Sequence, residues 1–399
     1  GFGQGEGQTA APLREFILNV ERISLRNNRL MLTLPGGEVR DLGLDLELAR
    51  EGSERHVQAT LASSAGARIA VVARGLGNPF TPQLFSGQLY LDMQSTDLGA
   101  VRRMLADRFL SAWTDGTADL QLWLNWDRGT PSVAARLESG DLLVAADDDS
   151  WQLPLQRLAV QARLLQRENG WTLFLSNLHL AQGDVEWTLP RAQLDTGGSA
   201  LRLRTGGFAL APINTILTEQ AAVPESLREV FTALQPRGQV SALQFDIDNT
   251  ARPADDWQIA ANFEDVAVDS LHGAPGVRAA TGYARVTPTG GVVVLDGQAM
   301  SLDFPAIYSE PLEFEDLYGT LNLDWDAKAV RLASGLLTTR GEEGVAKVLF
   351  GLNIPLQPDD TGIEMGLLVG LHDTHPVHRA KYIPYILDPS LLSWLADSL

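Results

Sequence analysis

Apolar and polar residues alternate along most of the chain, in short runs that Gly, Pro, Asn or Asp interrupt. Residues 117–129 (TADLQLWLNWDRG) illustrate the pattern, because apolar side chains recur at every second position from Leu120 to Trp126. Successive side chains of a β-strand point to opposite faces of its sheet, so these apolar residues share one face. The clearest runs of this kind are residues 23–34, 39–48, 69–73, 88–93, 171–180, 199–203, 290–295, 318–325, 345–354 and 363–371.

These runs recur about every 8 to 12 residues and predict on the order of 25 strands in one meandering antiparallel sheet. Turn sequences separate them, as at residues 35–37, 169–170, 196–198 and 289–291, because Gly can adopt positive φ without steric cost. The expected fold is therefore mostly β.

Three windows have helical spacing instead. In residues 97–111, Asp97 can cap a helix with apolar residues at positions 98, 101, 105 and 109. Residues 210–234 predict a helical hairpin, because Pro224 stands at a helix start and positions 227, 230, 231 and 234 are apolar. In residues 378–399, Asp388 and Pro389 precede an apolar stripe at positions 392, 395, 396 and 399. We therefore expect a few short helices.

The helical windows resemble copies of one unit. The first two are each followed by a strand that begins at a glycine, Gly116 or Gly238. Repeats of this kind favour an array extended along one axis. We expect a flexible leader at residues 1–11 and three repeat units at residues 12–116, 117–237 and 238–399.

Charge and composition exclude several classes of binding partner. The 399 residues carry 31 Lys and Arg against 50 Asp and Glu, a net charge of −19. Because phosphates need a basic partner surface, this balance argues against nucleic acid and against adsorption to anionic headgroups. The chain has no cysteine, which fits an oxidising compartment. No apolar run reaches the roughly 20 residues of a membrane helix, and the chain starts at Gly1 without a signal peptide, so we expect an internal portion of a longer protein.

Catalytic motifs find little support. Residues 194–197, Leu-Asp-Thr-Gly, match the core of an aspartic-peptidase signature, in which two carboxylates share a proton. This four-residue motif occurs once, so its dyad would require a dimer, and a hairpin turn is the simpler interpretation. No nucleophile elbow and no phosphate-binding Lys loop is present. We expect no enzyme, and a hydrolase built around Asp195 is the distant alternative.

Metal and cofactor motifs are also weak. His372, Asp373, His375 and His378 are residues of the types that bind zinc, but their spacing matches no helical pair, so a solvated loop is expected. The run of Asp at 147–149 lacks the Gly and Glu of a calcium loop. The Gly-rich residues 1–7 follow no strand and open no helix, unlike a dinucleotide fingerprint. We expect neither a metal nor a cofactor.

The repeated apolar strand faces remain to be explained. They can form a closed β-sandwich core, which periodicity alone favours, or they can line an open trough, which the shortage of helices and the repeats favour. Burying an acyl chain releases about 0.8 kcal/mol per CH₂, so a 16-carbon chain in such a trough is favoured by on the order of 12 kcal/mol. The attraction is non-directional, so the chain can slide. A structural or scaffold β-repeat protein, with a closed dry core and protein partners, is the alternative function.

The hairpin that ends in residues 382–399 (YIPYILDPSLLSWLADSL), the Gly-led strands and residues 313–326 (EFEDLYGTLNLDWD) resemble the YhdP proteins of the AsmA-like superfamily. The resemblance covers nearly the whole chain from about residue 12 and implies an elongated, strongly curved antiparallel β-groove. It also implies a periplasmic lipid transfer protein of Gram-negative bacteria, anchored in the inner membrane and carrying phospholipid between the inner and outer membranes. Partners at either membrane would bind regions outside this chain.

The family supplies no catalytic residue, so the groove lining is predicted from alternation alone. We expect the lining to include Leu120, Leu122, Leu124, Trp126, Leu321, Leu323 and Trp325.

Overall fold

The computed structural model describes residues 18–33, 39–63, 66–98, 113–145, 152–219, 225–271, 274–342, 344–356, 363–373, 381 and 383–398. The 21 strands in these ranges belong to one antiparallel sheet, with three α-helices of 10 residues each. The predicted mostly-β antiparallel fold with few short helices is confirmed. The chain divides into two compact units, Gly1–Glu186 (unit 1) and Trp187–Leu399 (unit 2).

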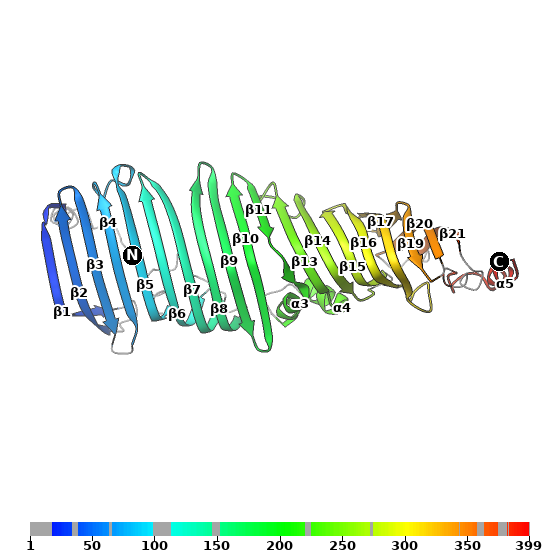
Figure 1. Ribbon diagram of the computed structural model, residues 1–399, viewed down its shortest axis with the longest axis horizontal. Coiled ribbons are helices and arrows are strands. Elements are labelled where there is room, and N and C mark those ends of the chain that lie inside the picture. The colour runs from blue at the N-terminus through cyan, green and yellow to red at the C-terminus, as the bar shows by residue number, and fades with distance from the viewer. Residues whose placement is uncertain are drawn as a thin grey trace. The chain divides into compact units, whose positions relative to one another are not determined.

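Unit 1 is a meander in which each strand pairs antiparallel with the next (Figure 1). Its strands are β1 (Arg22–Thr33), β2 (Val39–Glu51), β3 (Glu54–Ser63), β4 (Arg68–Leu76), β5 (Ser86–Asp97), β6 (Trp113–Asp127), β7 (Thr130–Ala145), β8 (Gln152–Arg167) and β9 (Gly170–Gln182), with a 3-10 turn at Pro82–Leu84.

Unit 2 contains β10 (Val185–Gly197), most of which lies beyond the boundary, β11 (Ala200–Thr205), β12 (Phe208–Ala209), α3 (Leu210–Glu219), α4 (Glu225–Leu234), β13 (Arg237–Ile247), β14 (Trp257–Val268), β15 (Gly276–Thr287), β16 (Gly290–Asp303), β17 (Leu312–Trp325), β18 (Ala329–Ser334), β19 (Leu337–Gly341), β20 (Gly344–Pro355), β21 (Glu364–His372) and α5 (Pro389–Ser398). Strands β18 and β19 both pair with β17 on one side and β20 on the other, so together they act as one interrupted strand.

The helices agree with two of the three predicted windows. Helices α3 and α4 form the hairpin expected at residues 210–234, although Val230 of the expected stripe is exposed. Helix α5 begins after Asp388, whose carboxylate accepts hydrogen bonds from the hydroxyl and the amide of Ser390. These bonds lower the pKa of Asp388. Of the window at 97–111, only Leu98 is both helical and within the described residues, where it is buried, because residues 99–111 lie outside them.

Bulges bend several strands at residues with left-handed φ. Asn27, Ser95 and Asp265 have φ of 54°, 46° and 51°, and each lies where the pairing register shifts. Their amides donate to side chains of the next strand in sequence, at 2.7 Å to Asp45, 2.7 Å to Asp119 and 3.2 Å to Thr281. A bulge increases local bending and twist but removes one ladder bond. The neighbouring side chain replaces that bond, so the bend leaves no amide unpaired at these three positions.

A second recurring feature pairs a glycine with an aspartate of the adjacent strand or its end. Gly116, Gly238 and Gly344 have φ of 128°, 105° and 108°. A Cβ at these positions would lie 2.9, 2.4 and 2.6 Å from the carbonyl oxygens of Asp141, Asp265 and Asp373, which themselves have positive φ. The residue two positions after each glycine is buried, namely Ala118, Val240 and Ala346. Gly116 and Gly238 lie in the two strands that indicated repeats, but the strands begin earlier than expected, at Trp113 and Arg237. The boundaries predicted after residues 116 and 237 stay predictions.

The close approach of Gly238 to the Asp265 carbonyl predicts that a side chain at position 238 would destabilise the fold. In Gly238→Ala, the new methyl group would overlap the Asp265 carbonyl, and the alanine backbone would be held at a strained positive φ. The free energy of unfolding should therefore fall by about 1–3 kcal/mol. Gly366→Ala is the matched control, because its Cβ would meet no atom within 4 Å. Urea unfolding followed by tryptophan fluorescence compares the two variants. Equal midpoints would contradict the steric argument.

Candidate functional site

The apolar residues of unit 1 align into rows that cross the strands. Residues directly opposite each other on paired strands point to the same face of the sheet, so the pairing register identifies each row. One row crosses from β1 to β9 and consists of Ile23, Leu48, Val57, Ala73, Leu89, Leu124, Val133, Leu164 and Leu173. A second crosses the same nine strands and consists of Leu25, Leu46, Ala59, Val71, Leu91, Leu122, Ala135, Ala162 and Leu175. Every member of both rows is apolar.

A third apolar row crosses from β2 to β8 and consists of Leu44, Leu61, Ile69, Met93, Leu120, Leu137 and Val160. Leu120, Leu122 and Leu124 therefore each belong to a different one of three adjacent rows. We call the surface that the three rows form the apolar face of unit 1.

Burial distinguishes this face from a closed core. In β6, Leu120, Leu122, Leu124 and Trp126 are all half-buried. Cross-strand neighbours about 4.5–5.5 Å away shield the flanks of such side chains, whereas full burial requires a second layer above them. Fully buried residues concentrate at the Leu120 end, in a cluster of Leu98, Ala118, Leu137, Leu142, Leu155 and Leu158. The remainder of the face keeps part of its apolar surface accessible.

The opposite face of unit 1 carries a polar row beside a mixed one. The row consisting of Asp45, Thr60, Ala70, Asp92, Gln121, Arg136, Gln161 and Ser176 contains a single apolar residue. A neighbouring row mixes polar and apolar residues and consists of Glu47, Gln58, Val72, Tyr90, Trp123, Ala134, Arg163 and Phe174. The ring centroids of Tyr90 and Trp123 are 5.3 Å apart, beside a hollow of about 770 Å³. The two faces of the sheet are therefore chemically distinct.

Trp126 stands at the end of the apolar positions of β6. It pairs with Gly87 and Pro131, and its indole N–H donates to the carbonyl oxygen of Pro82 at 3.0 Å. Trp325 of β17 repeats this arrangement in unit 2, because its indole N–H donates to the carbonyl oxygen of Pro288 at 2.8 Å. Each indole thus satisfies its donor at a turn and leaves the ring on the apolar side of its strand.

Unit 2 has its own apolar row, which includes Leu323. The row crosses β10, β11, β13 to β18, β20 and β21, and consists of Leu194, Leu203, Phe245, Ile259, Val286, Gly291, Leu323, Leu332, Leu352 and Met365. Leu321 lies on the same face, paired with Val293, and Trp325 pairs with Val330. The predicted lining residues thus form two groups, one in each unit, and their role as a lining stays a prediction.

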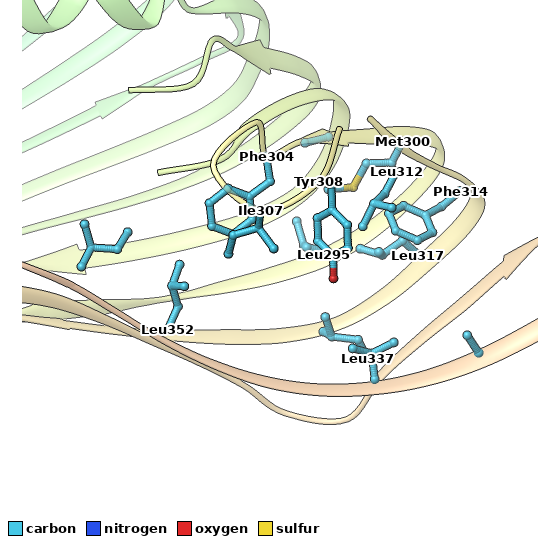
Figure 2. Close-up of a cluster of buried hydrophobic side chains, with 14 residues drawn as sticks. Leu295, Met300, Phe304, Ile307, Tyr308, Leu312, Phe314, Leu317, Leu337 and Leu352 are labelled. Atoms are coloured by element: carbon cyan, nitrogen blue, oxygen red, sulfur yellow. The ribbon is translucent and has the colours of Figure 1, made fainter. Parts of the chain in front are cut away.

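A cavity of about 440 Å³ opens on this face of unit 2. Its walls come mainly from β14 to β20 and include Leu321 and Leu323, together with Leu295, Leu317, Leu337 and Val348. Many of these side chains belong to a large buried cluster, around which the strands curve in Figure 2. The volume falls within the usual range of about 300–1,000 Å³ for small-molecule sites.

The segment between β16 and β17 folds into this cluster. Phe304, Ile307 and Tyr308 are buried, and the amides of Ile307 and Tyr308 both donate to the carbonyl of Phe304 at 2.9 Å. Tyr385 holds the segment from outside, because its amide donates to the Ile307 carbonyl at 3.0 Å and its hydroxyl to the Pro305 carbonyl at 2.8 Å. Sequence reasoning missed this segment, although the apolar run from Phe304 to Tyr308 in a connection was a usable signal.

The candidate catalytic and metal-binding motifs lie in hairpins, in exposed segments or outside the described residues. Asp195 lies in the β10–β11 hairpin, 3.7 Å from Arg204, and accepts a hydrogen bond from Gln193. A second Asp-Thr-Gly, at residues 360–362, lies outside the described residues. His372 pairs with Asp373 at 2.9 Å, and both are exposed. Residues 1–11, 147–149, 375 and 378 also lie outside the described part, within which no group of three metal-binding side chains occurs.

The fold and these surfaces define an antiparallel β-sheet protein with apolar rows on one face of each unit. The model of the YhdP protein family matches residues 2–399, so the chain belongs to the YhdP family. Membership makes it an AsmA-like protein of the cell envelope. Searches of curated proteins and of solved structures returned no match. Among the described residues, no helix has the length and apolar character needed to cross a membrane.

Hydrogen bonds in the turn after Trp325 predict an unusually low pKa for the Asp326 carboxyl. Arg331 donates to Asp326 at 2.8 Å, and the amides of Lys328 and Ala329 donate to the same carboxylate, which lowers the pKa of Asp326 to about 2. Because the folded pKa is depressed, the stabilisation is complete above the ordinary value of 3.8 and is lost as pH falls toward 2. Carboxyl NMR should give a midpoint near 2, and Arg331→Ala should raise it. A wild-type midpoint near 4 would contradict this geometry.

Proposed function

We propose that this chain is part of a lipid transfer protein that shields phospholipid acyl chains on its apolar sheet faces between the inner and outer membranes. The proposal rests chiefly on the two uninterrupted apolar rows from β1 to β9, whose side chains are mostly half-buried. Family membership supports the envelope setting. The periplasmic location, the inner-membrane anchor and partners at either membrane are parts of the proposal.

The energetics favour an acyl chain on these rows. Each CH₂ group removed from water contributes about 0.8 kcal/mol, so a chain that covers a row is held without any directional contact. Adjacent strands lie about 4.8 Å apart, which provides an apolar residue of the same row at each step across the sheet. Because each step presents a similar surface, a bound chain can move along the row without a deep energy minimum.

The rest of the unit suits the same role. The opposite face is largely polar, and the chain has a net charge of −19, which favours solubility and opposes adsorption to anionic membranes. An envelope scaffold with a closed core is the alternative function. It would require the apolar face of unit 1 to be covered, whereas Leu122, Leu124 and Trp126 are each half-buried.

A substitution in the middle row tests the proposal. Leu122→Asp places a carboxylate among acyl contacts, where an unpaired charge is costly, but its half-buried position lets it reach water in the unloaded protein. We expect cross-linking of unit 1 to a phospholipid with a photoreactive acyl chain to fall about 10-fold or more. Peptide mass spectrometry maps the cross-links, and circular dichroism should stay unchanged.

Asn125→Asp is the matched control, because it adds the same charge to the same strand but on the opposite, exposed face. It should leave cross-linking unchanged. If wild-type unit 1 gives no cross-links, or if Leu122→Asp unfolds the region as a dry core would, the conduit is wrong and the scaffold is favoured.

A further inference from the structure

The cavity of unit 2 contains two polar side chains among otherwise apolar walls. Of the residues that line it, only Tyr308 and Thr339 carry a hydroxyl, and none is charged. Thr339 lies on β19 between Leu317 and Ala346 of the neighbouring strands, and it is 2% exposed. Tyr308 enters from the segment between β16 and β17, and Figure 2 shows its hydroxyl directed past Leu295 toward Leu337.

The Thr339 hydroxyl is buried without a hydrogen-bond partner in the described part of the chain. A buried polar group in this state costs about 1–3 kcal/mol, so valine would be the expected residue in a purely structural core. Thr172 of β9 provides the contrast, because it is also buried but accepts a hydrogen bond from Arg167 at 3.3 Å. Other described side chains also have buried polar atoms without a partner, Thr205 among them, but Thr339 is the one that lines this cavity. Its position in the cavity wall, together with the unused donor, points to a ligand atom.

We propose that the hydroxyls of Tyr308 and Thr339 form an anchor for the carbonyl oxygen of an acyl ester, whose hydrocarbon chain occupies the rest of the cavity. An ester carbonyl offers lone pairs and no donor, so it matches two hydroxyl donors. The proposal rests on the proposed lipid function and adds a class of ligand group and two recognition residues to it.

Charge selects the ester over a free fatty acid. A carboxylate in the cavity would need a cation, and the lining residues include neither Lys nor Arg. Lys381, the nearby cation, is instead engaged outside with the Glu313 carbonyl and the Phe314 ring. Burial raises the pKa of Tyr308, which keeps its hydroxyl protonated and able to donate.

The segment that carries Tyr308 is held in place for this role. Its own amide bonds to Phe304 and the two bonds from Tyr385 fix the backbone on which the ring stands. Thr339 is fixed by strand pairing on both sides. The backbones that carry both side chains are therefore ordered without a ligand, which lowers the ordering cost of binding.

Competition between ester and ether lipids tests the anchor in the full chain. The probe is phosphatidylcholine with a photoreactive acyl chain, and the readout is its cross-linking to unit 2 peptides. Unlabelled dipalmitoyl phosphatidylcholine should compete about 3- to 10-fold better than its dialkyl ether analogue, because only the ester has the carbonyl. Thr339→Val and Tyr308→Phe should each bring this ratio toward 1 while ether competition is retained.

A stability measurement separates recognition from structure. Without lipid, Thr339→Val should keep or raise the melting temperature, since it removes an unpaired buried hydroxyl, whereas Thr172→Val should lower it and leave the ratio unchanged. Equal competition by ester and ether in the wild type, or a ratio unaffected by both cavity variants, would overturn the anchor and leave the lipid function standing. Absence of any cross-link in either unit would overturn both.

Discussion

Strand register is the constraint on which the rest of this protein depends. A shift of one residue in any pairing would move that strand's apolar side chains to the opposite face and interrupt every row that crosses it. Strand β5 pairs with β4 without a register shift, and it pairs with β6 without a shift from Leu120 to Trp126. Leu122 therefore lies opposite Leu91, and Leu91 lies opposite Val71. Each strand contributes only two or three residues to the face, and the face exists because all the registers agree.

Bending has to be achieved without disturbing those rows. The bulges at Asn27, Ser95 and Asp265 lie beside the rows, and their freed amides bond to side chains of the next strand. The glycines at 116, 238 and 344 allow close approach of a neighbouring backbone where any Cβ would collide. Bending and pairing are therefore handled at different positions along the strands, which lets the sheet curve while the apolar registers stay continuous.

Both units have apolar rows on one face of the sheet, but these rows are covered to different extents. In unit 1, most row residues are half-buried, and the buried ones, Met93 and Leu137, lie in the third row, at the end where the cluster around Leu142 forms. In unit 2, a larger buried cluster forms because the segment from Phe304 to Tyr308 supplies side chains above the sheet. This covering segment leaves a cavity among apolar side chains. A hydroxyl without a hydrogen-bond partner costs free energy in such a cavity but little on an open face, where water can bond to it.

The sequence by itself determined the mostly-β fold, many of the strands and the two described helical regions, since alternation, helical spacing and turn residues are local signals that act within one element. Within such a strand it also determined which residues share a face. It also identified Leu120, Leu122 and Leu124 as co-facial. It did not reveal that these residues continue into rows of nine, because register depends on pairing between strands. Nor did it single out Tyr308 or Thr339, because a tyrosine in a connection and a threonine in a strand are unremarkable until tertiary packing buries both side chains in the wall of an apolar cavity.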